Sequence, residues 1–382
     1  MKNIGKSKNG ISRRKFLGST AAAAALTMVP LSYGCTNKTP AAAGPDASGK
    51  PNSKFGGVQI GAITYSWRSM PSGVENIIKY CKVAGISSIE LMSGDLEQYL
   101  GAPKNPMAGM FGPGAGGPRP TGAAPASTPP PPPPPPPAGA APGGARPAGA
   151  PGGGFQRPPL TPEQEAARAK YNQDLKDWRV GMDMAKVEGA RKLFDDAGIG
   201  IHIVKFSPAR WSDEEIDYAF KAAKAMGAKG VCDELGEEAV KKLAPIAEKH
   251  GMYAIFHQHM QFATEGFSYD PFLAVSPAVM MNFDAGHFFG STGIHPNTII
   301  EKYHDRLVSV HMKDKTGPNT DPANQNQVWG QGQMPIADVL LLVKKNNWPL
   351  YCDIELEYDI KPWSDAVKEV KTCVQYARNI LI

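Results

Sequence analysis

The sequence predicts an α/β fold, a single (β/α)8 barrel of the TIM type with one long insertion. Eight short apolar segments have the character of buried strands, and segments with apolar residues at helical spacing separate them. Ligand-type side chains follow several of these strands directly, as expected where barrel strands end at a site. The alternative is a doubly wound open sheet. No Gly-x-Gly-x-x-Gly follows the first strand, so a dinucleotide-binding fold lacks its usual support.

The first β-α-β unit precedes the insertion. We expect a strand at 58–64, a helix at 73–84 and a second strand at 88–92, joined by a right-handed crossover. Residues 102–160 then consist mostly of Gly, Pro and Ala, with nine consecutive prolines at 129–137. This composition buries too little apolar surface to offset the entropy of ordering, so we expect a disordered insertion rather than a partner-binding segment.

The rest of the barrel is expected after the insertion. We predict strands at 199–204, 230–232, 252–256, 279–283, 308–310 and 351–356. Helices are expected at 161–196, 213–226, 237–250, 298–304, 336–346 and 363–380, and a loop of small residues from Gly286 to Gly293.

Five of these strands end in metal-ligand or proton-transfer side chains. A buried carboxylate such as Asp284 is costly unless its charge is compensated, although it could instead cap a following helix or turn. Carboxylates combined with imidazoles suit one divalent cation such as Mn²⁺, Mg²⁺, Co²⁺ or Zn²⁺. Such a cation would polarise a carbonyl or hydroxyl oxygen while a neighbouring side chain moves a proton. The strand-end residues are Glu234, His257, His259, Asp284, His311 and Glu355.

Six short segments carry a family resemblance over residues 58 to 382, apart from the insertion. They are Thr64-Tyr65-Ser66-Trp67, Phe256-His257-Gln258-His259, Asn282-Phe283-Asp284-Ala285-Gly286-His287, Val310-His311-Met312-Lys313-Asp314, Trp329-Gly330-Gln331-Gly332 and Ile354-Glu355-Leu356-Glu357-Tyr358. In these segments the chain resembles the xylose-isomerase-like barrel superfamily, in particular the sugar phosphate isomerase/epimerase group that includes inosose dehydratase.

The resemblance implies that Asp284, His311 and Glu355 are metal ligands. Epimerases of the group with established chemistry place a metal-binding, proton-abstracting Glu on the fifth strand, where this chain has His257. A subgroup with His-x-His at that point carries a Glu on the fourth strand, which Glu234 matches. The fourth ligand is therefore Glu234 or His257, and we favour Glu234.

Further roles follow from the same resemblance. Glu234, His257 and Glu355 are expected to take part in catalysis, together with Lys313, which would stabilise an enediolate or bind a substrate oxygen unless it is a solvated loop lysine. Trp329-Gly330-Gln331-Gly332 either closes over the sugar or forms a plain turn. Substrate contacts are expected from Trp67, His259, His287, Trp329 and Glu357.

The implied activity is a metal-dependent isomerase or epimerase of a sugar, keto-sugar or cyclitol that acts through an enediolate. A dehydratase of an inosose-like or keto-sugar substrate and an inactive carbohydrate-binding barrel are the alternatives. Metal binding separates the enzymes from the binding module, which has no need of the full ligand set. An apurinic endonuclease is disfavoured because the histidines of a trinuclear zinc site are missing.

Charge and targeting signals lie in the first 35 residues. Six of the 41 basic residues and none of the 36 acidic residues fall there, so the remaining chain is nearly neutral and lacks a nucleic-acid footprint. Ser12-Arg13-Arg14-Lys15-Phe16-Leu17 is a twin-arginine motif followed by an apolar segment at 21–31, which predicts export of the folded protein by the twin-arginine machinery to the periplasm or envelope. A lipid anchor at Cys35 and cleavage near 41–43 are alternatives.

The predicted organisation is a signal segment at 1–35, a linker at 36–54 and the barrel at 55–382. The remaining cysteines are widely spaced without a C-x-x-C pair, so we expect buried free thiols at Cys81, Cys232, Cys352 and Cys373.

Overall fold

The structure is a computed structural model, and it describes residues 49–107 and 160–382. The twin-arginine motif, Cys35 and the proline run lie outside the described residues. Among the helices that are described, none is long and apolar enough to cross a membrane. The four cysteines of the described ranges are free and buried.

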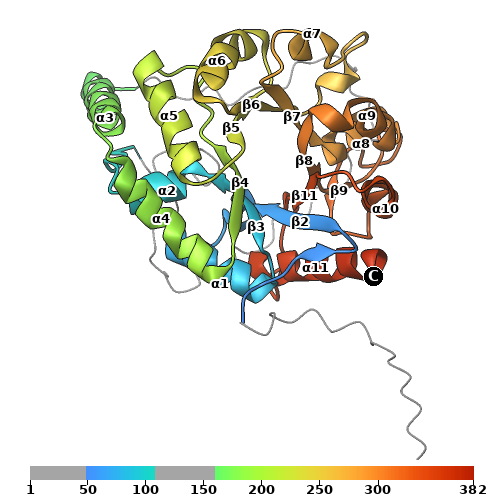
Figure 1. Cartoon of the computed structure of the whole chain (residues 1–382). Coiled ribbons are helices and arrows are strands. Elements are labelled where there is room, and N and C mark those ends of the chain that lie inside the picture. The colour runs from blue at the N-terminus through green and yellow to red at the C-terminus, as the bar shows by residue number, and fades with distance from the viewer. Residues whose placement is uncertain (1–48, 108–159) are drawn as a thin grey trace, which may run out of the picture. The chain divides into compact units, whose positions relative to one another are not determined.

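Parallel strands close into a barrel, which confirms the predicted TIM-barrel fold (Figure 1). The barrel closes because its first strand, β2, pairs with β3 on one side and with the last strand, β11, on the other. A short strand β1 (Lys54–Phe55) adds to β2 in antiparallel orientation. The barrel strands are β2 (Val58–Ile63), β3 (Ser88–Met92), β4 (Gly200–Lys205), β5 (Gly230–Glu234), β6 (Tyr253–His257), β7 (Val279–Asp284), β8 (Leu307–Met312) and β11 (Tyr351–Ile354).

Helices form a ring around these strands (Figure 1). Their apolar residues recur every three or four positions and are buried, as Ile77, Cys81 and Ala84 are in α1. The α-helices are α1 (Val74–Ala84), α2 (Ser93–Tyr99), α3 (Pro162–Val180), α4 (Met184–Ala197), α5 (Asp213–Ala225), α6 (Glu237–His250), α7 (Asp270–Leu273), α8 (Ala285–Thr292), α9 (Asn297–Tyr303), α10 (Ile336–Asn346) and α11 (Ala366–Leu381). Short 3-10 helices lie at Thr64–Trp67, Gln261–Ala263 and His304–Arg306, and β9 (Asp314–Lys315) pairs with β10 (Asn326–Gln327).

The single helix expected at 161–196 is wrong, because two helices occupy this range. A capping box formed by Thr161 and Gln164 begins α3, and α3 ends before Gly181. The Asp183 side chain accepts a hydrogen bond from the Ala185 N–H and begins α4. The break lets α4 turn its own apolar face towards the barrel, whereas α3 is polar on nearly all sides.

The loop expected after Asp284 is also wrong, because helix α8 begins there at once. Asp284 is its N-cap and accepts a hydrogen bond from the His287 N–H at 2.7 Å. The small residues that suggested a loop instead allow close packing of the helix. A Cβ atom at Gly286 would overlap Lys313 Cγ and lie 2.6 Å from the Lys313 carbonyl oxygen.

The chain packs on the barrel before the predicted end of the linker. Ser53 is buried, and its hydroxyl donates to the Ile60 carbonyl at 2.6 Å and lies 3.0 Å from the Ser87 hydroxyl. Ordered packing therefore begins a few residues before 55.

A buried ion cluster joins the two segments that flank the insertion. Arg179 on α3 binds both carboxylate oxygens of Glu97 on α2, at 2.8 and 3.2 Å, and Glu215 on α5 at 3.1 Å. The guanidinium also lies 3.5 Å from the centre of the Trp211 ring. The barrel is thus continuous across the insertion through side-chain contacts.

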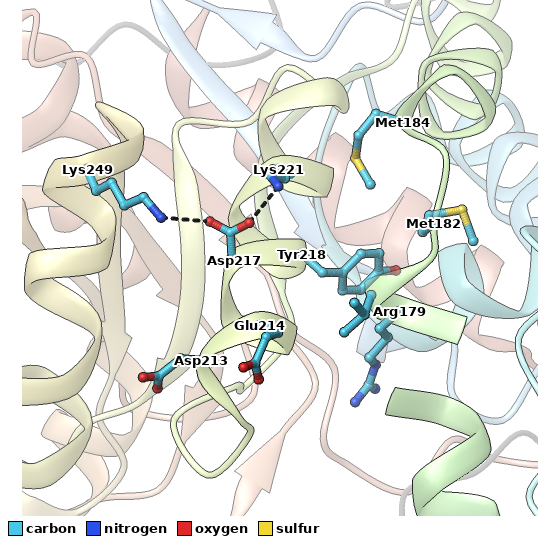
Figure 2. A pocket seen from close by; sticks show the side chains of 10 residues that line it. Arg179, Met182, Met184, Asp213, Glu214, Asp217, Tyr218, Lys221 and Lys249 are labelled. Carbon is cyan, nitrogen blue, oxygen red and sulfur yellow. Dashed lines mark hydrogen bonds and ion pairs between the residues drawn. The ribbon is translucent and has the colours of Figure 1, made fainter. Parts of the chain in front are cut away.

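A surface cavity of about 580 Å³ lies beside this cluster, between the α3–α4 connection and helices α5 and α6 (Figure 2). Three of its charged side chains pair with one another. Asp217 binds the ammonium groups of Lys221 at 2.6 Å and Lys249 at 3.3 Å. Since no strand-end residue lines it, this cavity is separate from the site described next.

Candidate metal centre

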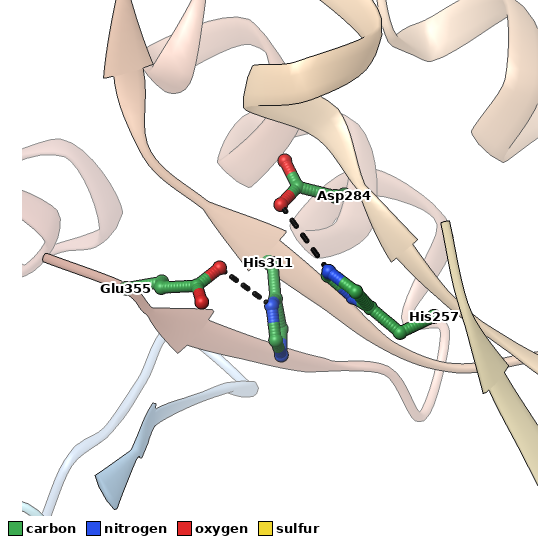
Figure 3. A group of neighbouring side chains, drawn as sticks. All are labelled: His257, Asp284, His311 and Glu355. Carbon is green, nitrogen blue, oxygen red and sulfur yellow. Dashed lines mark hydrogen bonds and ion pairs between the residues drawn. The ribbon is translucent and has the colours of Figure 1, made fainter. Parts of the chain in front are cut away.

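Four buried side chains from neighbouring strands meet at the C-terminal end of the barrel (Figure 3). His257 and Asp284 are the last residues of β6 and β7, His311 lies near the end of β8, and Glu355 directly follows β11. Asp284 and His311 are paired in the parallel register, which places them side by side. Each of the four offers a ligand atom, and these atoms lie within 4.8 Å of one another.

The geometry of this group fits a divalent cation. His257 Nε2 lies 3.9 Å from Asp284 Oδ2, too far for a hydrogen bond but suitable for two atoms that share a cation, since ligands about 2.1 Å from one metal lie roughly 3–4 Å apart. His257 Nδ1 is buried without a hydrogen-bond partner among the described residues. Burial, together with Lys205 and His311, lowers the pKa of His257 well below its usual value, so its imidazole is neutral and able to bind metal.

His311 is held between two carboxylates. Its Nδ1 lies 2.8 Å from Glu355 Oε2, and its Nε2 lies 2.7 Å from Glu90 Oε2 on β3. Burial alone would lower the pKa of His311, but the negative charges of Glu355 and Glu90 outweigh this effect. The pKa of His311 is therefore raised well above its usual value. A cation would therefore displace a proton from His311. Glu90 would then hold the ring in place, as carboxylates do for histidine ligands of metals.

Lys313 points into the same group and is only 2% exposed. Its ammonium lies 2.9 Å from Asp284 Oδ2 and 2.8 Å from both Glu355 Oε2 and Glu357 Oε2. Burial alone would lower the pKa of Lys313, but these carboxylates raise it above its usual value. The ammonium thus compensates the carboxylates and competes with a cation for two of them.

Glu234 lies apart from the four-residue group. Its side chain is 47% exposed, and its carboxylate binds the Lys205 ammonium at 2.7 Å and His259 Nε2 at 2.9 Å. Burial raises the pKa of Glu234, but His259 and Lys205 outweigh it and lower the value to about 2. The geometry therefore brings His257, rather than Glu234, together with Asp284, His311 and Glu355. Glu234 forms a second group with His257 and His259.

Of the side chains expected to contact substrate, His259, His287 and Glu357 border this site. The rings of His259 and His287 lie 5.1 Å apart, and His287 Nε2 lies 3.6 Å from Glu357 Oε2. The two tryptophans are instead buried in the hydrophobic core. Trp67 packs on Tyr80 and Trp329 packs on Tyr376, with ring centroids 5.9 Å apart in both pairs.

The segment that follows Trp329 is a fixed turn. The Asp314 carboxylate accepts hydrogen bonds from the backbone N–H groups of Gly330, Gly332 and Met334 at 2.8, 2.9 and 3.2 Å. This anchoring explains Gly332, since a Cβ at that position would overlap the same carboxylate, whereas Gly330 has a φ of +86° that favours glycine.

Sequence reasoning missed several polar residues inside the barrel, of which Glu90 is the most closely tied to the site. Ser88 and Glu90 occupy alternate positions of an otherwise apolar strand, and this period is the available signal for an inward-facing polar row. Below the candidate metal centre, His202 is held by Ser88 and Asp353 at 2.9 and 2.8 Å. The sequence does not indicate which of these inward-facing polar residues contact the candidate metal ligands.

Three solved structures resemble the chain. A probable 3-DHS dehydratase from Bacillus anthracis, AsbF, has 12% identity and a TM-score of 0.49, covering 83% of this chain and 98% of that chain. The IolI protein with a bound zinc atom has 13% identity and a TM-score of 0.49, covering 85% and 98%. A sugar phosphate isomerase/epimerase from Parabacteroides distasonis has 15% identity and a TM-score of 0.46, covering 85% and 96%.

The sequence itself matches a family. Inosose dehydratase of Clostridium beijerinckii is 25% identical over 153 residues, which cover 35% of this chain and 51% of that protein, so the match spans about half of the relative's length. Residues 187–376 match the model of the xylose isomerase-like TIM barrel family. The closed parallel barrel shows that the chain has a TIM-barrel fold, and about half of the chain is similar to this family.

Proposed function

We propose that this protein is a divalent-metal-dependent enzyme that isomerises or epimerises a sugar, keto-sugar or cyclitol through an enediolate. The observation that carries the proposal is the buried group of two imidazoles and two carboxylates at the strand ends. This donor set suits a divalent cation, and a barrel that only binds carbohydrate has no need of it. The residues that would hold the cation are His257, Asp284, His311 and Glu355.

The bound cation would polarise a carbonyl or hydroxyl oxygen of the substrate. The Lys313 ammonium lies among the ligand carboxylates and would stabilise negative charge that develops on an enediolate oxygen. His259, which Glu234 orients at 2.9 Å, is half exposed at the mouth and would carry the proton to or from the substrate carbon.

A dehydratase is the second candidate, and one observation favours it. The hydrogen bond to Glu234 raises the pKa of His259, so this imidazole can be protonated near neutral pH. Once a neutral His259 has taken the proton from the substrate carbon, the imidazolium, which Glu234 stabilises, could give that proton to the leaving hydroxyl group, which departs as water when the carbon–oxygen bond breaks. The name of the relative, inosose dehydratase, is in keeping with such a reaction.

Proton exchange in D₂O tests the proposal. Metal-loaded protein is incubated with a panel of keto-sugars and inososes, and NMR follows deuterium incorporation and products. An epimerase yields the epimer with deuterium at the inverted carbon, whereas a dehydratase yields a product that has lost water. Asp284→Asn should abolish exchange, and Asp305→Asn, at an exposed position, is the matched control. Carbohydrate binding without exchange by any substrate would contradict the proposal and favour a binding module.

A further inference from the structure

Lys313 and Lys315 follow β8, and each packs against one of the two glycines of helix α8. Lys313 lies over Gly286, as described above. One helical turn further on, a Cβ at Gly290 would lie 2.8 Å from Lys315 Cε and would overlap the Asn324 side-chain oxygen. Helix α8 thus packs against both lysines, which lie two residues apart in the sequence.

The two lysines differ in their partners. Lys313 has three carboxylates within 2.9 Å. Lys315 is only 3% exposed, yet in the described part of the chain its ammonium has neither an ion pair nor a side-chain hydrogen bond. Burial and the nearby Lys313 lower the pKa of Lys315, while Asp284 and other carboxylates oppose this from beyond ion-pair distance. The side chain is buried, but its Nζ atom still reaches solvent, so the unpaired ammonium is accessible to an anionic ligand.

Other polar groups close to Lys315 also lack partners. Both ring nitrogens of His287 and the side-chain oxygen of Asn324 are buried without a hydrogen-bond partner among the described residues. Lys315 packs on Gly290, which lies three residues after His287 on α8 and therefore on the same face of the helix. The mouth of the barrel thus holds a cation and polar groups without hydrogen-bond partners among the described residues.

We propose that Lys315 binds a carboxylate group of the substrate and thereby selects sugar acids over neutral sugars. This inference rests on the proposed function for the sugar portion of the ligand, whereas the anion site itself does not depend on that function. A single ammonium beside His287 and Asn324 suits a monoanion. A phosphate dianion is disfavoured because Asp284, Glu355 and Glu357 lie nearby and would repel its second charge.

Binding of three probes to the metal-loaded protein tests the proposal. D-glucuronate, D-glucose and D-glucose 6-phosphate are compared by isothermal titration calorimetry at low and high salt. We expect glucuronate to bind on the order of tenfold more tightly than glucose, as one charge-assisted contact allows. This preference should weaken in high salt and fall to about unity in Lys315→Gln, with glucose binding and metal content unchanged. Lys315→Arg should keep the preference, and Lys371→Gln, on the exposed side of α11, is the control.

Equal binding of glucuronate and glucose by the wild-type protein would overturn the proposal, whatever the variants do. So would a preference that survives in Lys315→Gln. Tighter binding of glucose 6-phosphate that Lys315→Gln abolishes would replace the carboxylate by a phosphate. If the preference depends on Lys315 but no substrate exchanges protons in D₂O, the anion site stands and the proposed enzyme fails.

Discussion

Lys313→Gln should tighten metal binding while it lowers turnover. In the structure the ammonium lies between Asp284 and Glu355, two of the four candidate ligands, and also contacts Glu357. A cation that binds these carboxylates must compete with Lys313 for their oxygens. Glutamine is one atom shorter and removes the competing charge, and it leaves the carboxylates close together and uncompensated in the metal-free protein.

The expected magnitude follows from the contacts that the cation contests. Each hydrogen bond to a charged group contributes roughly 1.5–3 kcal/mol, so two contested contacts represent about 3–6 kcal/mol. Part of this free energy is recovered in the wild-type protein, because a displaced Lys313 ammonium keeps its contact with Glu357 and can bind water. We therefore expect the dissociation constant of the metal to fall by at least about tenfold, or about 1.4 kcal/mol. Turnover should fall because the enediolate loses its nearby positive charge.

Competition with a chromogenic chelator gives the metal affinity, and deuterium exchange gives the turnover. Lys371→Gln is again the control, since it removes a positive charge far from the strand ends. Weaker or unchanged metal binding in Lys313→Gln would refute the argument, because it would mean that Lys313 and the cation do not share ligands.

Three further predictions concern the fold. Arg179→Met should lower the free energy of unfolding, measured by urea titration, by about 3–5 kcal/mol, because it leaves Glu97 and Glu215 buried without their cation. A loss below about 1 kcal/mol would contradict the role of this cluster. Replacing residues 110–157 by a short Gly-Ser linker should change the unfolding free energy by about 1 kcal/mol or less, because loop length contributes slowly, and a loss as large as that of Arg179→Met would show that the insertion packs. Gly286→Ala should lower the free energy of unfolding by roughly 1–3 kcal/mol, because the added Cβ would overlap Lys313. Gly189→Ala, where no atom lies within 4 Å of the added Cβ, should be neutral or stabilising by about 0.5–1 kcal/mol, and equal effects of the two would contradict the packing of Lys313 on Gly286.

The strands and their order could be predicted from the sequence because hydrophobic runs of this kind are a local property. Strands such as 88–92 and helices such as 237–250 lie where the periodicity placed them. The failures have local causes as well. Asp183 begins a new helix within a continuous helical pattern, and Gly286 and Gly290 serve the packing of α8 rather than a loop.

The candidate site could be predicted only in part. Asp284, His311 and Glu355 meet because parallel strand ends share one rim, and that follows from the fold class. Whether Glu234 or His257 joins them depends on side-chain pairing across the barrel. Lys205 on β4 binds the Glu234 carboxylate, and no spacing in the sequence reveals this contact.

The metal content of purified variants tests the central claim most directly. We expect about one divalent cation per chain by elemental analysis of the wild-type protein. We also expect loss of metal in Asp284→Asn, Glu355→Gln and His257→Ala, with the barrel still folded by circular dichroism, and retention in Glu234→Gln. Stoichiometric metal in Asp284→Asn and Glu355→Gln would contradict the claim that the four buried strand-end residues bind the cation. Loss of metal in Glu234→Gln with retention in His257→Ala would contradict the choice of His257 as the fourth ligand.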